Sequence, residues 1–255
     1  MGGGNIIGRI KSNVMIEKEI LKKIFFDSVP QIRFRRNDPF YNSVFDFMYE
    51  AGKKIFHGAK LLNISSSKDQ SGVRENVYRE KFFEGAEITG IDFWHDNFVL
   101  DGRESSHKLP FEDGLFDFLI TTKYIMEHTT EPGEILKECA RVLKKGGEAF
   151  IVTSFMNIQH QQPYDFFRMT EFGVAYLAKK AGFSKFTVTP TDGFFYTVPY
   201  LSHYFQRSLN LPRPITYVLD VIHNRIIIPV GYFLHKYDNG RGKNLTSHHL
   251  LWAKK

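Results

Sequence analysis

The sequence contains a single cysteine and no long apolar run. Because Cys139 stands alone among 255 residues, an internal disulfide framework is excluded, a reducing compartment is expected, and the thiol is predicted to be buried in a helix. No stretch approaches the ~18 consecutive apolar residues that a membrane-spanning helix needs, and the N-terminus lacks a signal-peptide core. We therefore expect a cytoplasmic protein.

Several motifs that carry chemistry are also missing. The sequence has no Cys/His spacing typical of a metal site, no G-x-x-x-x-G-K-[S/T] phosphate loop and no G-x-S-x-G nucleophile elbow. We therefore predict no metal site, and neither phosphate-loop nor serine-nucleophile chemistry.

Acidic residues are scarce at both ends of the chain. Residues 1–60 carry 11 Lys/Arg and 6 Asp/Glu, residues 61–192 carry 15 and 20, and residues 193–255 carry 8 and 2, so the net charge of +6 belongs to the ends. The last segment also holds eleven aromatic residues. This combination predicts a surface for an anionic membrane, which would make the protein peripheral to the membrane, or for a lipid-linked substrate. A helical cap buried on the sheet or in a homodimer fits at least as well, while scattered Lys/Arg argue against nucleic acid.

The apolar pattern changes near residue 60. Before it, apolar residues at three- and four-residue intervals predict helices over residues 14–26 and 44–56. After it, short apolar runs alternate with helical patterns, which predicts βαβ units and a mostly parallel sheet with helices on both faces. The expected strands are residues 60–64, 86–92, 116–120, 148–153, 186–189 and 249–253. The helix before the fourth strand should begin at Pro132 and end at glycine caps, Gly146 and Gly147.

Ligands of open α/β sheets bind beyond the C-terminal ends of the strands. Asp92 closes the second run, where a carboxylate can accept hydrogen bonds from both hydroxyls of an adenosine ribose. The first run is followed by Ser65, Ser66 and Ser67 in place of the glycines expected in such a turn. Their N–H groups can still donate, but each left-handed non-glycine residue costs on the order of 1 kcal/mol.

Several ordered motifs resemble a known family. Residues 109–117 read LPFEDGLFD, followed by Glu127-His128, and residues 136–147 read LKECARVLKKGG. These are similar to the class I S-adenosylmethionine-dependent methyltransferases of the small-molecule type. Residues 163–170, PYDFFRMT, and then Ala181-Gly182-Phe183 resemble a subgroup often associated with glycan and cell-envelope functions. The resemblance covers residues 60–192 and the final strand.

The resemblance implies a Rossmann-like, seven-stranded sheet and S-adenosylmethionine as cofactor. It also implies which residues face that cofactor. The methionine part would meet the turn after the first strand, the ribose the end of the second, the adenine the segment before Leu109, and the sulfonium the end of the third strand. In that order, these residues are Asn63, Ser65, Ser66 and Ser67; Asp92 and Phe93; Asp101; and Thr121 or Thr122. At Asn63 the sequence departs from the family, which has an acid there.

The acceptor side of the site is predicted from the segments after the third and fourth strands. A hydroxyl acceptor would need a base such as His128 or His160, whereas a carboxylate acceptor would need none. Tyr164, Asp165 and Arg168 are expected to face the acceptor, with Arg168 available for an anionic group. A structural salt bridge to a nearby acid explains Arg168 equally well.

The resulting organisation has four parts: a helical N-terminal cap (1–59), a methyltransferase core (60–192), a helical aromatic-rich insertion (193–246) and the final strand of the core (247–255). The function indicated is methyl transfer from S-adenosylmethionine to a small-molecule, glycan or lipid-linked acceptor. The serine-rich turn leaves open a catalytically inactive binding or scaffolding protein of the same fold. A nicotinamide-dependent oxidoreductase also uses an acid after the second strand, but the motif at residues 109–117 argues against it.

Overall fold

A computed structural model describes residues 17–27, 38–64, 82–91, 108–121, 125–160 and 162–255. Six strands form one sheet in the order β2-β1-β3-β4-β6-β5. Their bounds are β1 Lys60–Ile64, β2 Glu87–Ile91, β3 Phe116–Thr121, β4 Leu143–Ser154, β5 Lys185–Pro190 and β6 His248–Lys254. Of these six strands β6 alone runs in the reverse direction, so that its pairings with β4 and β5 are antiparallel. The predicted α/β fold with a mostly parallel sheet is confirmed; a seventh strand is not among the described residues.

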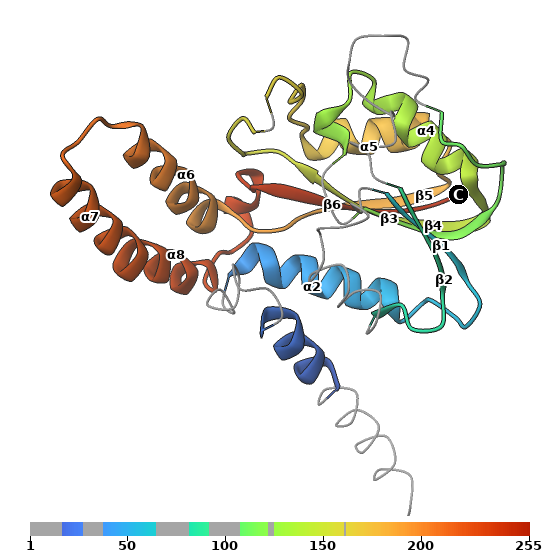
Figure 1. Cartoon of the computed structure of the whole chain (residues 1–255), viewed down its shortest axis with the longest axis horizontal. Coiled ribbons are helices and arrows are strands. Elements are labelled where there is room, and N and C mark those ends of the chain that lie inside the picture. The colour runs from blue at the N-terminus through green and yellow to red at the C-terminus, as the bar shows by residue number, and fades with distance from the viewer. Residues whose placement is uncertain (1–16, 28–37, 65–81, 92–107, 122–124, 161) are drawn as a thin grey trace, which may run out of the picture.

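Helices cover both faces of the sheet (Figure 1). On one face lie α4 (Pro132–Val142) and α5 (Glu171–Lys180), and on the other lie α2 (Pro39–Gly52) and the helix at residues 17–27. Phe25, Phe45 and Met48 of the second layer are fully buried in a cluster with Phe118 and Phe150 of the strands. The expected N-terminal helices therefore form a layer of the sandwich.

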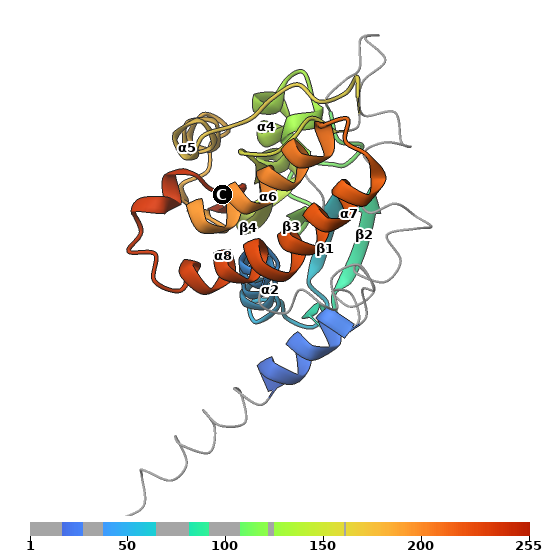
Figure 2. The same cartoon turned by 90° about the vertical axis from the view of Figure 1, so that its left-hand side faces the viewer.

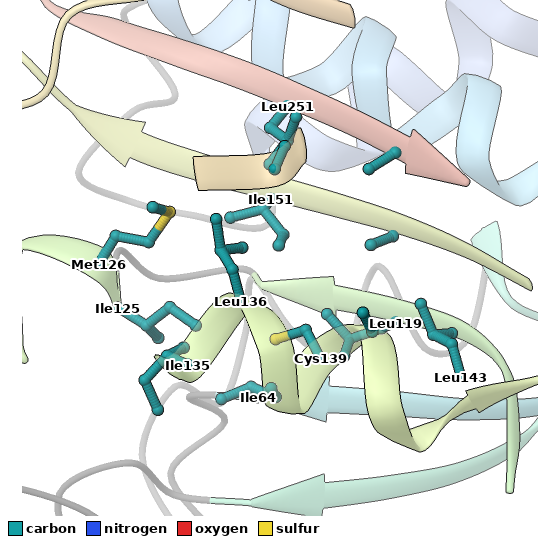
Figure 3. Packing of buried hydrophobic residues seen from close by; sticks show 14 of the residues in the cluster. Ile64, Leu119, Ile125, Met126, Ile135, Leu136, Cys139, Leu143, Ile151 and Leu251 are labelled. Carbon is teal, nitrogen blue, oxygen red and sulfur yellow. The ribbon is translucent and has the colours of Figure 1, made fainter. Parts of the chain in front are cut away.

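The core on the other face is built around α4 (Figure 3). Ile135, Leu136 and Cys139 of this helix pack against the strand residues Leu119 and Ile151. Burial raises the pKa of the Cys139 thiol to about 12, so it is a packed apolar group at neutral pH. The prediction of a buried structural cysteine is confirmed.

Two helix boundaries differ from those predicted. The helix α2 begins at Pro39, not at residue 44, because Asp38 caps it by accepting a hydrogen bond from the Tyr41 N–H (3.3 Å) and Pro39 occupies its first turn. The prediction that α4 ends at glycine caps is wrong. Leu143 already has extended dihedral angles, and Gly146 takes a left-handed φ of 83° four residues after the helix ends, where its N–H donates to the Lys255 carbonyl.

The insertion consists of α6 (Phe194–Ser208), α7 (Arg213–Ile222), η3 (His223–Ile227), α8 (Ile228–His235) and the short η4 (Arg241–Asn244). Figure 2 shows α6, α7 and α8 as a layer beyond one end of the sheet. Gly231 lets α8 approach α6, because a Cβ there would lie 2.5 Å from the Phe195 carbonyl oxygen. The insertion is thus packed closely on itself.

Residues Arg213–His235 form one continuous helix of 23 residues. Pro229, which by itself favours a break, lies inside this helix without ending it. The π-helical turn at His223–Ile227 ends two residues before that proline, and such a turn accommodates the missing N–H without ending the helix. By length and composition alone this helix could cross a membrane, so the expectation that no segment is long and apolar enough to span one is corrected.

Candidate functional site

The first four strands end together at one edge of the sheet. Ile64 of β1 pairs with Ile91 of β2 and with Thr121 of β3, and Thr121 pairs in turn with Ile151 of β4. All four strands are parallel, so their C-terminal ends form the edge where ligands of such sheets bind. The site is therefore built from this edge outward.

Asn63 lies in β1 beside this edge. The residue pairs with Gly90 of β2 and Ile120 of β3 in the sheet, and it is 2% exposed. Its Oδ1 has no hydrogen-bond partner among the described residues. A buried amide oxygen is costly to leave unbonded, so this atom is available to accept a hydrogen bond from a ligand.

Thr121, at the end of β3, uses its hydroxyl inside the sheet. The Oγ1 accepts a hydrogen bond from the Val152 N–H of β4 at 3.1 Å, and the residue is fully buried. Its predicted contact with the sulfonium stays a prediction. Seven other predicted cofactor residues lie outside the described residues: Ser65, Ser66, Ser67, Asp92, Phe93, Asp101 and Thr122.

The structure brings His128 and His160 together. His128 ends the short turn η2 (Met126–His128) after β3, and His160 lies in the loop after β4. Their ring centroids are 4.8 Å apart and the rings are nearly perpendicular, at 87°. Burial lowers the pKa of His128, although the Tyr164 carbonyl bonded to its Nδ1 at 2.7 Å acts in the opposite direction.

Arg168 and Asp165 form a clamp that shapes the loop after β4. The guanidinium binds both Asp165 oxygens, at 2.5 and 2.7 Å. Its remaining N–H groups donate to the backbone carbonyls of Asn157, Ile158 and Phe167. All five donors of the guanidinium are therefore used. The sequence left two roles open for Arg168, and this arrangement favours a structural salt bridge over binding of an anionic acceptor group.

Burial opposes ionisation of the Asp165 carboxyl, but the hydrogen bonds from Arg168 and from the His160 N–H (2.8 Å) outweigh it and hold its pKa below the ordinary value. Asp165 therefore stays charged and ties the backbone of His160 to the clamp. Tyr164 contributes its carbonyl to His128 and is half-buried. Direct contact of Tyr164, Asp165 or Arg168 with an acceptor stays a prediction.

Glu127 is a functional candidate that the sequence reasoning missed. It is 1% exposed, and neither carboxylate oxygen has a hydrogen-bond partner among the described residues. Burial raises its pKa to about 8. The Glu127-His128 motif was visible in the sequence, but nothing there indicated that this acid would be buried beside two histidines.

A cleft lined by tyrosines lies between this edge and the insertion. A cavity of about 220 Å³ beside the loop after β4 contacts His160, Asn157 and His248. It shares several tyrosines with a cavity of about 740 Å³ that reaches α8. The shared residues are Tyr41, Tyr196, Tyr200 and Tyr204.

Ordered rings and hydroxyls line this cleft. Tyr196 stacks on Tyr200 with an interplanar angle of 9° and on Tyr232 with an angle of 19°. The Tyr200 hydroxyl donates to Asn157 Oδ1 at 3.0 Å, and the Tyr232 hydroxyl donates to Asp38 Oδ2 at 2.7 Å. These bonds hold flat apolar faces with polar edges in the cleft.

A buried polar network supports the wall of the cleft. Asp192 accepts hydrogen bonds from the hydroxyls of Thr191, Thr197 and Ser247, and Ser247 Oγ lies 2.8 Å from His248 Nδ1. Burial raises the pKa of Asp192 despite these bonds and lowers that of His248 to about 3. The network anchors the start of β6 to the end of β5 and fixes both ends of the insertion.

Comparison with known proteins agrees with this architecture. Residues 72–151 match the family model described as "Methyltransferase domain". Among curated proteins, none matches the sequence significantly.

Similar solved structures include a SAM-dependent methyltransferase from Aquifex aeolicus (18% identity, 67% of this chain and 92% of that chain, TM-score 0.42). One from Archaeoglobus fulgidus is 13% identical over 78% and 86% of the two chains, with a TM-score of 0.45. A Haemonchus contortus phosphoethanolamine N-methyltransferase 2, bound to phosphomonomethylethanolamine and S-adenosylhomocysteine, is 14% identical over 81% of this chain and 52% of its own, with a TM-score of 0.46. This chain thus spans about half the length of the worm enzyme.

The family match falls on the segment that carries the predicted motifs, from the region after β1 to β4. It confirms the resemblance of this chain to the class I S-adenosylmethionine-dependent methyltransferases.

Proposed function

We propose that this protein transfers a methyl group from S-adenosylmethionine to a small acceptor held in the tyrosine-lined cleft. The observation that carries the proposal is the methyltransferase-domain match over residues 72–151. This match includes the ends of β2 and β3, where the ribose and the sulfonium of the cofactor are expected. The cleft opens beside the same edge, at His160.

The described residues fit such a cofactor at one point. Asn63 presents a buried, unbonded Oδ1 at the end of β1, and this acceptor suits the amino group of the methionine part. When bound, the cofactor supplies a methyl group activated by the sulfonium. Apart from Thr121, the remaining predicted contacts lie outside the described residues.

This chain would act mainly by orienting the acceptor, because methyl transfer is an in-line displacement in which positioning dominates. The Asp165–Arg168 clamp holds the loop that carries His160. Each imidazole has its Nδ1 beside a backbone carbonyl, Tyr164 for His128 and Ile158 for His160, which fixes the orientation of both rings at this edge. That either of them acts as a base toward a hydroxyl acceptor stays a prediction.

The cleft favours a ring-bearing acceptor. Stacked tyrosine faces suit the apolar face of a sugar or another ring, and their hydroxyls suit its polar edge. The larger cavity, at about 740 Å³, lies within the range of roughly 300–1,000 Å³ that is usual for small-molecule sites. A glycan or lipid-linked sugar is therefore the acceptor class that we propose.

Calorimetry with S-adenosylmethionine and S-adenosylhomocysteine tests the proposal. We expect both to bind, and Asn63→Ala to weaken binding at least about tenfold, since one hydrogen bond to a buried group is worth roughly 1.5 kcal/mol. A Thr89→Ala variant, altered in β2 away from the strand ends, is the matched control. If neither S-adenosylmethionine nor S-adenosylhomocysteine binds at millimolar concentration, the proposed methyltransferase activity is refuted.

The serine-rich turn keeps a second function open, that of an inactive binding protein of this fold. Replacing Ser65 and Ser67 by glycine distinguishes the two. A weakened enzyme should gain cofactor affinity, because glycine removes the cost of a left-handed turn, whereas a repurposed site should show no gain.

We also propose that the insertion lies on an anionic membrane surface, so that the protein is cytoplasmic and peripheral. Only 11% of the most apolar 18-residue stretch of the helix Arg213–His235 is buried in the protein. Large apolar side chains on it are exposed, among them Tyr217 (70%), Ile226 (56%) and Phe233 (56%). Residues 193–255 carry eight basic and two acidic side chains, which complements anionic lipid.

The opposite side of this helix argues for lying on the membrane rather than crossing it. Asp220, near the C-terminal end of α7, accepts a hydrogen bond from Gln206 (2.9 Å) and pairs with Arg207 (2.8 Å) of α6. His223 is buried. This polar side is thus satisfied within the protein, while the apolar side is left for lipid.

Co-sedimentation with vesicles tests the membrane proposal. Wild type should bind vesicles containing phosphatidylglycerol and bind neutral phosphatidylcholine vesicles less. Ile226→Glu should lose binding, whereas Phe172→Glu, which alters an exposed residue of α5, should keep it. If the protein instead forms a concentration-dependent dimer and does not bind vesicles, the exposed apolar side of this helix would be a dimer interface and the membrane proposal would be refuted.

A further inference from the structure

Three side chains on two separate segments converge behind the tyrosine-lined cleft. Glu127 and His128 come from the turn η2 after β3, and His160 comes from the loop after β4. One ligand atom of each, a carboxylate oxygen or an imidazole nitrogen, lies within 4.8 Å of the others. That spacing is close enough for all three atoms to reach one ion.

The two imidazoles are fixed in the way that metal-binding histidines usually are. His128 Nδ1 is 2.7 Å from the Tyr164 carbonyl oxygen, and His160 Nδ1 is 3.1 Å from the Ile158 carbonyl oxygen. A proton on Nδ1 in each ring satisfies these bonds and fixes the orientation of the ring. Ligating histidines typically donate their other ring nitrogen to a carbonyl or carboxylate in this manner.

The acidic member of the cluster suits a cation. Glu127 is 1% exposed, and both of its carboxylate oxygens lack a hydrogen-bond partner of ordinary geometry among the described residues. A buried carboxyl group either stays protonated or is compensated by a positive charge, and a divalent cation beside the two imidazoles would supply that charge. The Arg168 guanidinium acts on Glu127 only through space, because all its donors are committed to Asp165 and backbone carbonyls.

We propose that Glu127, His128 and His160 bind a divalent transition-metal ion, with Zn²⁺ or Mn²⁺ as the expected occupants. Two imidazoles and one carboxylate form a mixed nitrogen and oxygen donor set that suits such ions. Three protein ligands leave a position open, as in catalytic rather than structural metal sites. This proposal disagrees with the sequence-based expectation of no metal.

The position of the site would allow the ion to act on the acceptor. His160 also lines the cleft of about 220 Å³, so the open position is adjacent to the space proposed for the acceptor. An acceptor hydroxyl bound there would lose its proton more readily, since a bound cation stabilises the alkoxide. This role rests on the proposed methyl transfer, whereas metal binding itself does not.

Metal binding can be measured without any assay of activity. Protein treated with a chelator and then dialysed should bind one Zn²⁺ or Mn²⁺ per chain by calorimetry. Glu127→Gln and His160→Asn should each weaken binding at least about tenfold. His57→Asn, which alters an exposed histidine, is the matched control and should bind as wild type does.

Thermal unfolding gives a second measurement of metal binding, which also shows whether each variant is folded. Added metal should raise the melting temperature of wild type and of His57→Asn but not that of Glu127→Gln. Without metal, Glu127→Gln should be about as stable as wild type, because glutamine fills the same space and places no charge in the buried site. Failure of wild type to bind either ion, or equal binding by Glu127→Gln, would overturn the site. Stoichiometric binding without methyl transfer would keep the site and count against the proposed function.

Discussion

His249 should make the stability of the protein fall as the solution is acidified. This residue of β6 is 3% exposed, its Nδ1 has no hydrogen-bond partner among the described residues, and its ring packs 5.4 Å from that of Phe155. Burial lowers its pKa from 6.5 to about 4. The folded protein therefore holds this imidazole neutral at pH values where the unfolded chain protonates it.

The size of the effect follows from the two pKa values. Below pH 6.5 the unfolded state binds one more proton than the folded state, so the free energy of unfolding decreases as pH falls, until the folded protein also binds the proton near pH 4. Between pH 7.5 and pH 5.0 the loss is about 2 kcal/mol, at about 1.4 kcal/mol per pH unit.

Urea denaturation at the two pH values measures this loss. Replacing His249 by glutamine removes the titrating group, so the drop in unfolding free energy should be about 2 kcal/mol smaller than in wild type. His57→Gln, at an exposed position, should keep the full drop. An identical drop in His249→Gln and wild type would refute the reasoning, because it would mean that the buried imidazole is not held neutral.

Three further predictions concern packing and the clamp. Gly231→Ala should lower the free energy of unfolding by about 2 kcal/mol through overpacking, because its Cβ would meet the Phe195 carbonyl; unchanged stability in urea would show that α8 does not pack there. Arg168→Met should cost about 3 kcal/mol by leaving the buried Asp165 carboxylate unpaired, and adding Asp165→Asn should recover part of the loss; a double variant no more stable than Arg168→Met would contradict the clamp. Cys139, fully buried, should not react with Ellman's reagent in native protein but should react in urea; rapid native labelling would place it at the surface.

Much of the fold was predictable because local patterns and sheet positions agree. The strand at residues 60–64 was predicted with the bounds it has, since its apolar residues fill a strand buried on both faces. Residues 14–26 and 44–56 were correctly predicted to contain helices, but Asp38 and Pro39 moved the start of α2. Such cap contacts act over three or four residues and are weak signals in a pattern of apolar spacing.

The less predictable features depend on contacts distant in sequence. Glu127 and His160 are 33 residues apart, and only the parallel pairing of β3 with β4 brings the segments after these strands together. Pro229 reads locally as a helix break, yet the π-helical turn before it keeps the helix continuous. The five donors of Arg168 are used by groups whose arrangement depends on the folded loop.

The placement of β6 has a consequence for the order in which the sheet forms. This strand, His248–Lys254, follows both β4 and β5 in the sequence, yet it lies between them in the sheet. Among the described strands β5 pairs only with β6, so it cannot join the sheet until residues 191–247 and then β6 have been synthesised. Deleting β6 would therefore remove an interior strand and leave β5 without its partner.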